Sequence, residues 1–154
     1  MKVIFLDVDG VLNSRTYTAW QIETQGHADV DQIDPKEVVL LKHIVDETGA
    51  EIVVTSSWRI GRGSPWCPFH VLQKELLRQG LVVHDCTPIL RSCRGDEIKA
   101  WIDSQEFIES FVILDDDCDM GEFTETEHFI NTSIDIGLTY EQAEQAIKVL
   151  NKHI

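Results

Sequence analysis

Short apolar runs alternate along this chain with stretches of helical spacing, and the runs predict strands. Residues 2–6 are apolar after one Lys and include β-branched and aromatic side chains. This pattern is expected of a strand buried on both faces in the middle of a parallel sheet. Four further apolar runs predict strands at residues 51–55, 81–84, 107–114 and 128–131.

Helical spacing of apolar residues predicts four helices among these strands. The clearest begins at Asp34-Pro35, which supplies an N-cap and a first-turn proline, and it ends at Gly49. The other three are predicted at residues 69–79, 94–102 and 140–150.

Alternating strands and helices predict an α/β fold with a mostly parallel five-stranded sheet and helices on both faces, in three layers. The 154 residues are enough for one domain, so we expect a single domain over residues 1–154. Residues 13–33 are polar and mixed and predict a loop or small flap, while residues 60–68 predict a loop rich in Gly and Pro.

The formal net charge is −14, which argues against a general nucleic-acid coat protein. The charge is unevenly distributed, because residues 59–94 contain six Lys or Arg and only two Asp or Glu. Five of the six arginines lie in this stretch. It is either a chance cluster on solvated loops or a local rim that attracts anions.

Targeting signals and cysteine usage favour a cytoplasmic protein. We expect no signal peptide, because no basic and apolar segment leads the chain, and no membrane span, because no apolar run approaches 18 residues. Reduced thiols are expected at Cys67, Cys86, Cys93 and Cys118. Three of these cysteines with His70 could suggest zinc, but their spacing fits no common zinc module.

The first predicted strand leads directly into Asp7 and Asp9, followed by Gly10. Paired carboxylates at the end of a buried strand are costly unless a cation lies beside them. The simplest interpretation is a divalent metal and a phosphate at the carboxyl end of the strand, where open α/β sheets bind ligands. The alternative is an acidic pair that begins a turn or binds Ca²⁺.

The second predicted strand ends in hydroxyl side chains, at Thr55 and Ser56. A hydroxyl followed by backbone amides is suited to holding a phosphate. Either residue can supply this hydroxyl, depending on where the strand ends.

The fourth predicted strand ends in an acidic cluster, Asp115-Asp116-Asp117-Cys118-Asp119. These carboxylates would repel each other strongly without a cation. Oxygen ligands suit Mg²⁺. We expect Asp115 or Asp116 to contact the metal directly, and Asp117 and Asp119 to lie farther out.

The segment Asp7-Val-Asp9-Gly10-Val11 resembles the first motif, D-x-D-G-[TV], of the haloacid dehalogenase (HAD) phosphohydrolase superfamily. The resemblance implies that Asp7 attacks phosphorus, and that Asp9 protonates the leaving group and later activates water. It implies a Rossmann-like HAD core and a Mg²⁺ site formed by Asp7 and Asp9 with Asp115 and Asp116.

Further HAD motifs match in order along the chain. Thr55 stands where the second motif has Thr or Ser, and Asp115-Asp116 stands where the fourth has its acids. The third motif is a Lys or Arg near the start of the helix before the fourth strand, which implies Arg94 first and Lys99 second. The substrate contacts expected around these residues are Gly10, Ser56, Arg59 and Lys99.

A narrower resemblance is to the HAD domain of Swiss Army Knife RNA-repair proteins. It rests on residues 5–13, Ser56-Ser-Trp-Arg59, residues 95–102, Ile113-Leu-Asp-Asp-Asp117 and the closing Gly137-Leu-Thr139. In those proteins the domain is proposed to trim phosphate at RNA ends. The function implied is a Mg²⁺-dependent phosphomonoesterase.

The HAD enzymes that act on small metabolites commonly carry a cap domain, inserted after the first motif or between the second and third. Here neither segment is long enough for a folded cap, so we expect an open site that suits a large phosphorylated substrate. A single-stranded nucleic-acid end is favoured, with Trp58 and Trp66 as stacking faces. The alternatives are a small-molecule or phosphoprotein phosphatase, a phosphotransferase, or a catalytically silent binding module.

Overall fold

The computed structural model describes residues 1–152 and contains one five-stranded sheet. The strands lie in the order β3-β2-β1-β4-β5, and every pairing is parallel. Their bounds are β1 Lys2–Leu6, β2 Glu51–Val54, β3 Val83–Cys86, β4 Ser110–Asp115 and β5 Phe129–Asn131. The predicted α/β fold is therefore confirmed, with β1 at the centre of the sheet.

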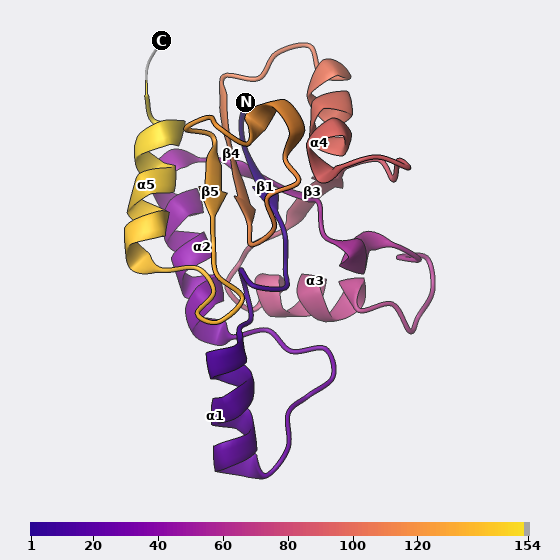
Figure 1. Cartoon of the computed structure of the whole chain (residues 1–154), viewed down its shortest axis with the longest axis vertical. Coiled ribbons are helices and arrows are strands. Elements are labelled where there is room, and N and C mark those ends of the chain that lie inside the picture. Colours follow the sequence, from indigo (N-terminus) through magenta and orange to yellow (C-terminus); the bar gives the residue numbers. More distant parts are fainter. Residues whose placement is uncertain (153–154) are drawn as a thin grey trace.

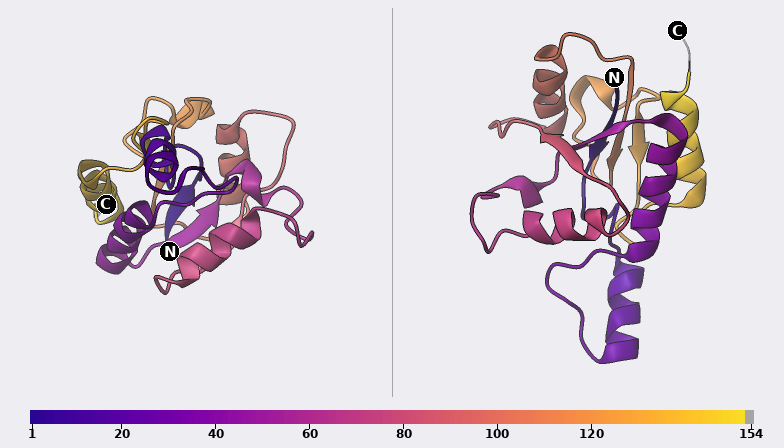
Figure 2. Two further views of the ribbon diagram at one scale, coloured as in Figure 1. Left: turned by 90° about the horizontal axis from the view of Figure 1, so that it is seen from below. Right: turned by 180° about the vertical axis from the view of Figure 1, so that it is seen from behind.

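Helices cover both faces of this sheet, as Figures 1 and 2 show. One apolar core joins the sheet to α2, α3 and α5, and a second joins it to α4 and the short 3-10 helix η2. None of the described helices has the length and apolar character needed to cross a membrane. The bounds are α2 Pro35–Thr48, α3 Phe69–Leu77, α4 Arg94–Asp103, η2 Gly121–Phe123 and α5 Tyr140–Leu150.

The apolar run of β1 divides between the two cores, because successive side chains point to opposite faces of a strand. Ile4 and Leu6 belong to the core beneath α2, α3 and α5. Val3 and Phe5 belong to the core beneath α4, where Phe5 packs edge-on against Trp101 with 5.4 Å between ring centroids. Both faces are buried, which explains why the strand is apolar without alternation.

Two segments differ from the sequence prediction. The stretch expected as a loop or flap contains helix α1 (Arg15–Gln25), which is capped by the side chain of Ser14 and buries only Gln21. A helix without an apolar face leaves no periodic signal in the sequence. Strand β3 begins two residues later than predicted, because Leu81 still donates its amide to Leu76 at the end of α3.

The register of strand pairing aligns the carboxyl ends of β1, β2 and β4. Leu6 of β1 pairs with Val54 of β2 on one side and with Leu114 of β4 on the other. The residues that follow continue the ladder, since the amide of Asp7 donates to Leu114 and the amide of Thr55 donates to Leu6. Asp7, Thr55 and Asp115 therefore meet at the same edge of the sheet.

Candidate active site

Three carboxylates converge at the carboxyl edge of the sheet. Oxygens of Asp7, Asp115 and Asp116 all lie within 4.8 Å of one another. Asp7 and Asp115 are buried, and Asp116 is half-buried. Within residues 1–152 this is the one group of three or more side chains so placed that they could hold a metal. The cysteines and His70 considered for zinc therefore do not assemble into a site.

The electrostatics of this cluster call for a cation. Burial raises the pKa of Asp115, and the neighbouring Asp7 raises it further. Burial also raises the pKa of Asp7, although Arg94 opposes this effect. Carboxylates in this position would retain protons unless a positive ion balanced them. An all-oxygen donor set in a compact group fits Mg²⁺, so the residues present fit the metal that the sequence implied.

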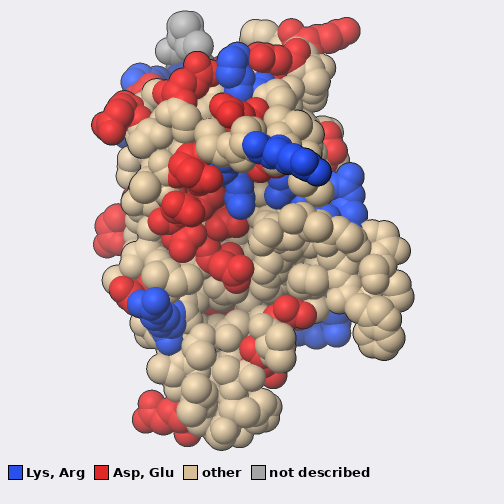
Figure 3. All heavy atoms as spheres, turned by 45° about the vertical axis from the view of Figure 1, so that its right-hand side comes forward, with Lys and Arg blue, Asp and Glu red and all other residues tan. Residues whose placement is uncertain are grey.

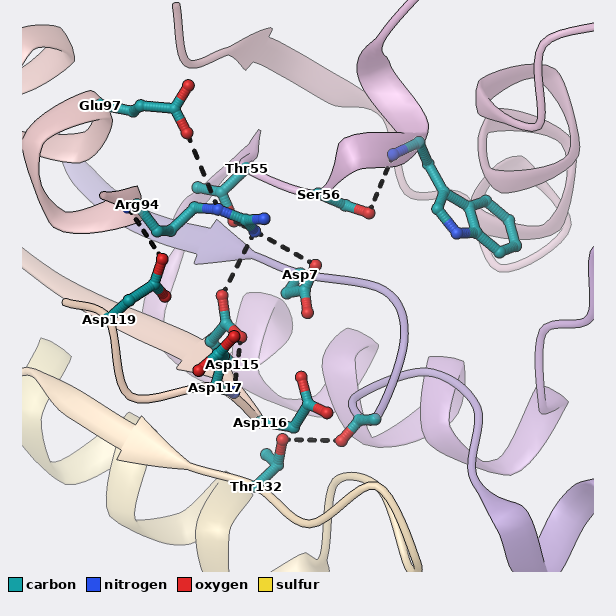
Figure 4. Close-up of polar contacts among 12 residues, drawn as sticks. Asp7, Thr55, Ser56, Arg94, Glu97, Asp115, Asp116, Asp117, Asp119 and Thr132 are labelled. Atoms are coloured by element: carbon teal, nitrogen blue, oxygen red, sulfur yellow. Dashed lines mark hydrogen bonds and ion pairs between the residues drawn. The ribbon is translucent and has the colours of Figure 1, made fainter. Parts of the chain in front are cut away.

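Arg94, at the start of α4, is the cation that the protein itself supplies. Its Nη1 lies 3.3 Å from Asp7 Oδ1, 3.3 Å from Asp115 Oδ2 and 3.4 Å from Thr55 Oγ1 (Figure 4). The helix start is fixed beside the acidic loop, because the amide of Gly95 donates to the carbonyl of Asp119. Arg94 is therefore placed to bond both the predicted nucleophile and a phosphate.

The hydroxyls after β2 have different surroundings. Thr55 is fully buried, and its hydroxyl lies within reach of Arg94. Ser56 is also buried, but its hydroxyl accepts the amide of Trp58 and so caps the short helix η1 (Ser57–Arg59). Of the two alternatives left open by the sequence, Thr55 is the one that lies among the acids and Arg94.

Asp9 lies outside the three-carboxylate cluster and is held by two donors. Asn13 Nδ2 donates to Asp9 Oδ1 at 2.9 Å, and Trp58 Nε1 donates to Asp9 Oδ2 at 3.1 Å. The carboxylate of Asp9 is not among the side chains that converge within 4.8 Å, so its predicted place among the metal ligands stays a prediction. A carboxylate held apart in this way is suited to exchange a proton with a leaving group.

Sequence reasoning missed this use of Asn13 and Trp58. Asn13 lies four residues after Asp9 in a tight loop, where Asn often bonds the local backbone, and its Oδ1 also accepts the amide of Gly10. Trp58 was expected to offer a stacking face, but it is only 7% exposed and belongs to the core. That expectation is wrong, because the indole is needed for packing and for its hydrogen bond to Asp9.

Two predicted substrate contacts are not at the site. Arg59 is 3% exposed, and its guanidinium donates to Glu97 at 2.8 Å and to backbone carbonyls that include Thr87 and Pro88. It therefore stabilises the framework behind the site and has no donor left for a phosphate. Lys99 is exposed on α4 and pairs with Asp103 at 3.0 Å. Of the two candidates for the third motif, Arg94 is the one that lies beside Asp7.

Gly10 is required by its conformation and by the closeness of Asp116. Its φ is +78°, and a Cβ added there would lie 2.5 Å from the carboxyl group of Asp116. Its carbonyl accepts the hydroxyl of Thr132, which ties the loop to the segment after β5. Gly10 therefore lets the first acidic loop approach the second, and its predicted contact with substrate stays a prediction.

The fold and these groups define a HAD-type α/β domain. The family model described as "HAD domain in Swiss Army Knife RNA repair proteins" matches residues 3–143, and the chain belongs to this family. Comparisons with curated proteins and with solved structures found no match to the chain. The match spans all of the acidic and hydroxyl residues described above.

Proposed function

We propose that this protein is a Mg²⁺-dependent phosphomonoesterase that forms an aspartyl phosphate and acts on phosphate at the ends of nucleic acids. The observation that carries the proposal is the position of Arg94, within 3.4 Å of Asp7, Thr55 and Asp115 at once. A single cation shared by a carboxylate, a hydroxyl and a metal-binding acid is suited to a phosphoryl group in transfer.

In the first half of the reaction Asp7 attacks phosphorus, and the bond from phosphorus to the leaving oxygen breaks. Asp9 gives its proton to that oxygen, so the leaving group departs as an alcohol. Arg94 and the Thr55 hydroxyl balance negative charge on the transferred phosphoryl oxygens. A Mg²⁺ ion held by Asp7, Asp115 and Asp116 would supply further charge neutralisation.

In the second half Asp9, now ionised, removes a proton from water. The resulting oxygen attacks the phosphorus of the aspartyl phosphate, which releases inorganic phosphate and restores Asp7. The hydrogen bonds from Asn13 and Trp58 keep the Asp9 carboxylate in one position through both steps. The same side chain therefore acts as acid and then as base, and no third titratable group is needed.

The surroundings of the site favour a large substrate. The two segments where a cap domain would be inserted form only α1 with its return loop, and η1, α3 and β3. Basic side chains lie beside a dense acidic group on the face shown in Figure 3. The loops after β2 and β3 expose Arg62, Arg91 and Trp66, of which Trp66 is 90% exposed. Exposed cations with an aromatic ring suit one single-stranded end.

The test compares oligonucleotides with a 3′- or 5′-phosphate against the matching mononucleotides. We expect kcat/KM to be at least ~10-fold higher for the oligonucleotide, with a difference that narrows as salt rises, because salt screens backbone contacts. Equal efficiency on both would refute the nucleic-acid substrate and leave the phosphatase proposal standing.

Metal dependence is tested in the same assay. Activity should be lost in excess chelator and restored by Mg²⁺, whereas Ca²⁺ should inhibit. Ca²⁺ accepts more ligands at longer distances, so it would engage both oxygens of Asp7 and prevent its attack. Full activity in chelator would contradict the proposed mechanism.

A further inference from the structure

A cavity of about 620 Å³ lies between α1 and the start of α2, and the proposed reaction makes no use of it. Its volume is in the range of sites that bind small molecules. The walls come from α1, from the first turn of α2 and from the loop between β5 and α5. They are lined by Ser14, Thr16, Tyr17, Trp20, Asp34, Pro35, Lys36, Glu37 and Ile136.

The walls of this cavity are bonded to the loop that holds Asp9. Asn13, which donates to Asp9, also donates to the carbonyl of Gln32 in the return from α1, and the next residue is Ser14. On the opposite wall, the loop before α5 accepts the amides of Arg15 and Thr16. The cavity is therefore connected to the proposed proton donor through Asn13 and the adjacent Ser14, on the α1 side of the site.

An aromatic pair forms the α1 wall. The rings of Tyr17 and Trp20 are stacked, with centroids 5.7 Å apart and an angle of 13° between their planes. Trp20 is 55% exposed, although it is the larger apolar group of the pair. Two nearly parallel rings at the edge of a cavity suit a third flat ring, and every nucleobase has a face that can stack in this way.

The α2 wall carries an unpartnered carboxyl group. Glu37 is 8% exposed, and within residues 1–152 its buried Oε2 has no hydrogen-bond partner. Burial raises the pKa of Glu37 to about 8, with a further contribution from Asp34 and opposition from Lys36. Buried polar atoms nearly always have a partner. Oε2 has almost no accessible surface, so a base edge reaches this carboxyl group only if the Glu37 side chain turns toward the cavity that it lines, where a neutral carboxyl group both donates and accepts.

We propose that the cavity lined by Tyr17, Trp20 and Glu37 binds a nucleobase next to the phosphate that Asp7 attacks. The identity of this ligand rests on the proposed function. Stacking and an edge contact distinguish a base from a sugar or a simple aryl group. Each of the four bases has such an edge, so the cavity recognises a base without selecting its sequence.

The first experiment does not depend on turnover. An unphosphorylated RNA trinucleotide is titrated into the metal-loaded protein, and the indole N–H signals are followed by NMR. We expect the Trp20 signal, assigned from its absence in Trp20→Phe, to shift with saturation. A Trp20 signal that does not respond would overturn the proposal, whether or not the protein proves to be a phosphatase.

The second experiment follows the ratio of kcat/KM for a phosphorylated trinucleotide to kcat/KM for phenyl phosphate. Trp20→Ala should lower this ratio about tenfold, and Ile136→Trp should lower it by filling the cavity. Ile22→Ala is the matched control, because Ile22 is exposed on the same helix and does not line the cavity. An unchanged ratio in both cavity variants of a working phosphatase would overturn the base site alone.

Discussion

Replacing Trp58 by Phe removes one of the two hydrogen bonds that hold the carboxylate of Asp9. The donor is the indole N–H, 3.1 Å from Asp9 Oδ2, while Asn13 still donates to Oδ1 at 2.9 Å. Phe keeps an aromatic ring in the core, where Trp58 is 7% exposed. The change therefore tests the hydrogen bond more than the packing.

The size of the effect follows from the exposure of Asp9. A hydrogen bond to a charged group contributes about 1.5–3 kcal/mol when it is shielded from water. Asp9 is exposed, so water can take the place of the lost donor and the lower end of this range applies. A loss of about 1.4 kcal/mol in transition-state stabilisation lowers the rate about tenfold.

The assay compares leaving groups, since a proton donor matters most for a poor one. The ratio of kcat/KM for an alkyl phosphate to that for p-nitrophenyl phosphate should fall about fivefold to tenfold in Trp58→Phe. Thermal unfolding of the variant serves as the control for packing. Equal losses on both substrates would show that Trp58 acts only by packing and would refute its role in positioning Asp9.

Three further predictions follow from the same contacts. Asp7→Asn should abolish turnover and keep the fold, since the amide cannot attack phosphorus; more than a few per cent of wild-type activity in a clean preparation would remove Asp7 as nucleophile. Arg59→Ala should lower the free energy of unfolding by about 3–5 kcal/mol, because it removes the closest ionic partner of the buried Glu97 and the donor to several backbone carbonyls. In denaturant titrations Lys99→Ala, which breaks only an exposed pair, should match the wild type. Burial raises the pKa of Glu37 from 4.5 to about 8 in the folded state. The unfolded chain therefore loses this proton first, and the free energy of unfolding falls as pH rises between these two values. Glu37→Gln should therefore gain stability relative to wild type by on the order of 3 kcal/mol from pH 5 to pH 8, and a constant difference would contradict the burial of an unpartnered carboxyl group.

Sequence reasoning performed best where the signal is local. The apolar run of residues 2–6 and the caps at Asp34 and Thr139 predicted elements that the structure contains, because burial on both faces and capping each leave a mark within a few residues. Helix α1 was missed because its only buried residue is Gln21. Its position depends on contacts with the return loop and with the loop before α5, and these have no periodic signal.

The choice between cations shows a second limit of the sequence. The motif resemblance implied Arg94 first and Lys99 second for the third motif, with Arg59 as a substrate contact, but composition alone does not separate the three. The structure buries Arg59 against Glu97, leaves Lys99 in solvent and brings Arg94 to Asp7. The positions of Arg59 and Arg94 depend on partners 38 and 87 positions away along the chain.

The sequence by itself determined the alternation of strands and helices and the placing of Asp7, Thr55 and Asp115 at strand ends, since parallel strands bring their carboxyl ends to one edge. Only the tertiary structure decided that the Asp9 carboxylate lies outside the group of Asp7, Asp115 and Asp116 and accepts a hydrogen bond from Trp58. It also decided that α1 and α2 enclose a cavity lined by Glu37. Strand position depends on local hydrophobic pattern, whereas the direction of a side chain depends on which distant groups pack against it and satisfy its hydrogen bonds.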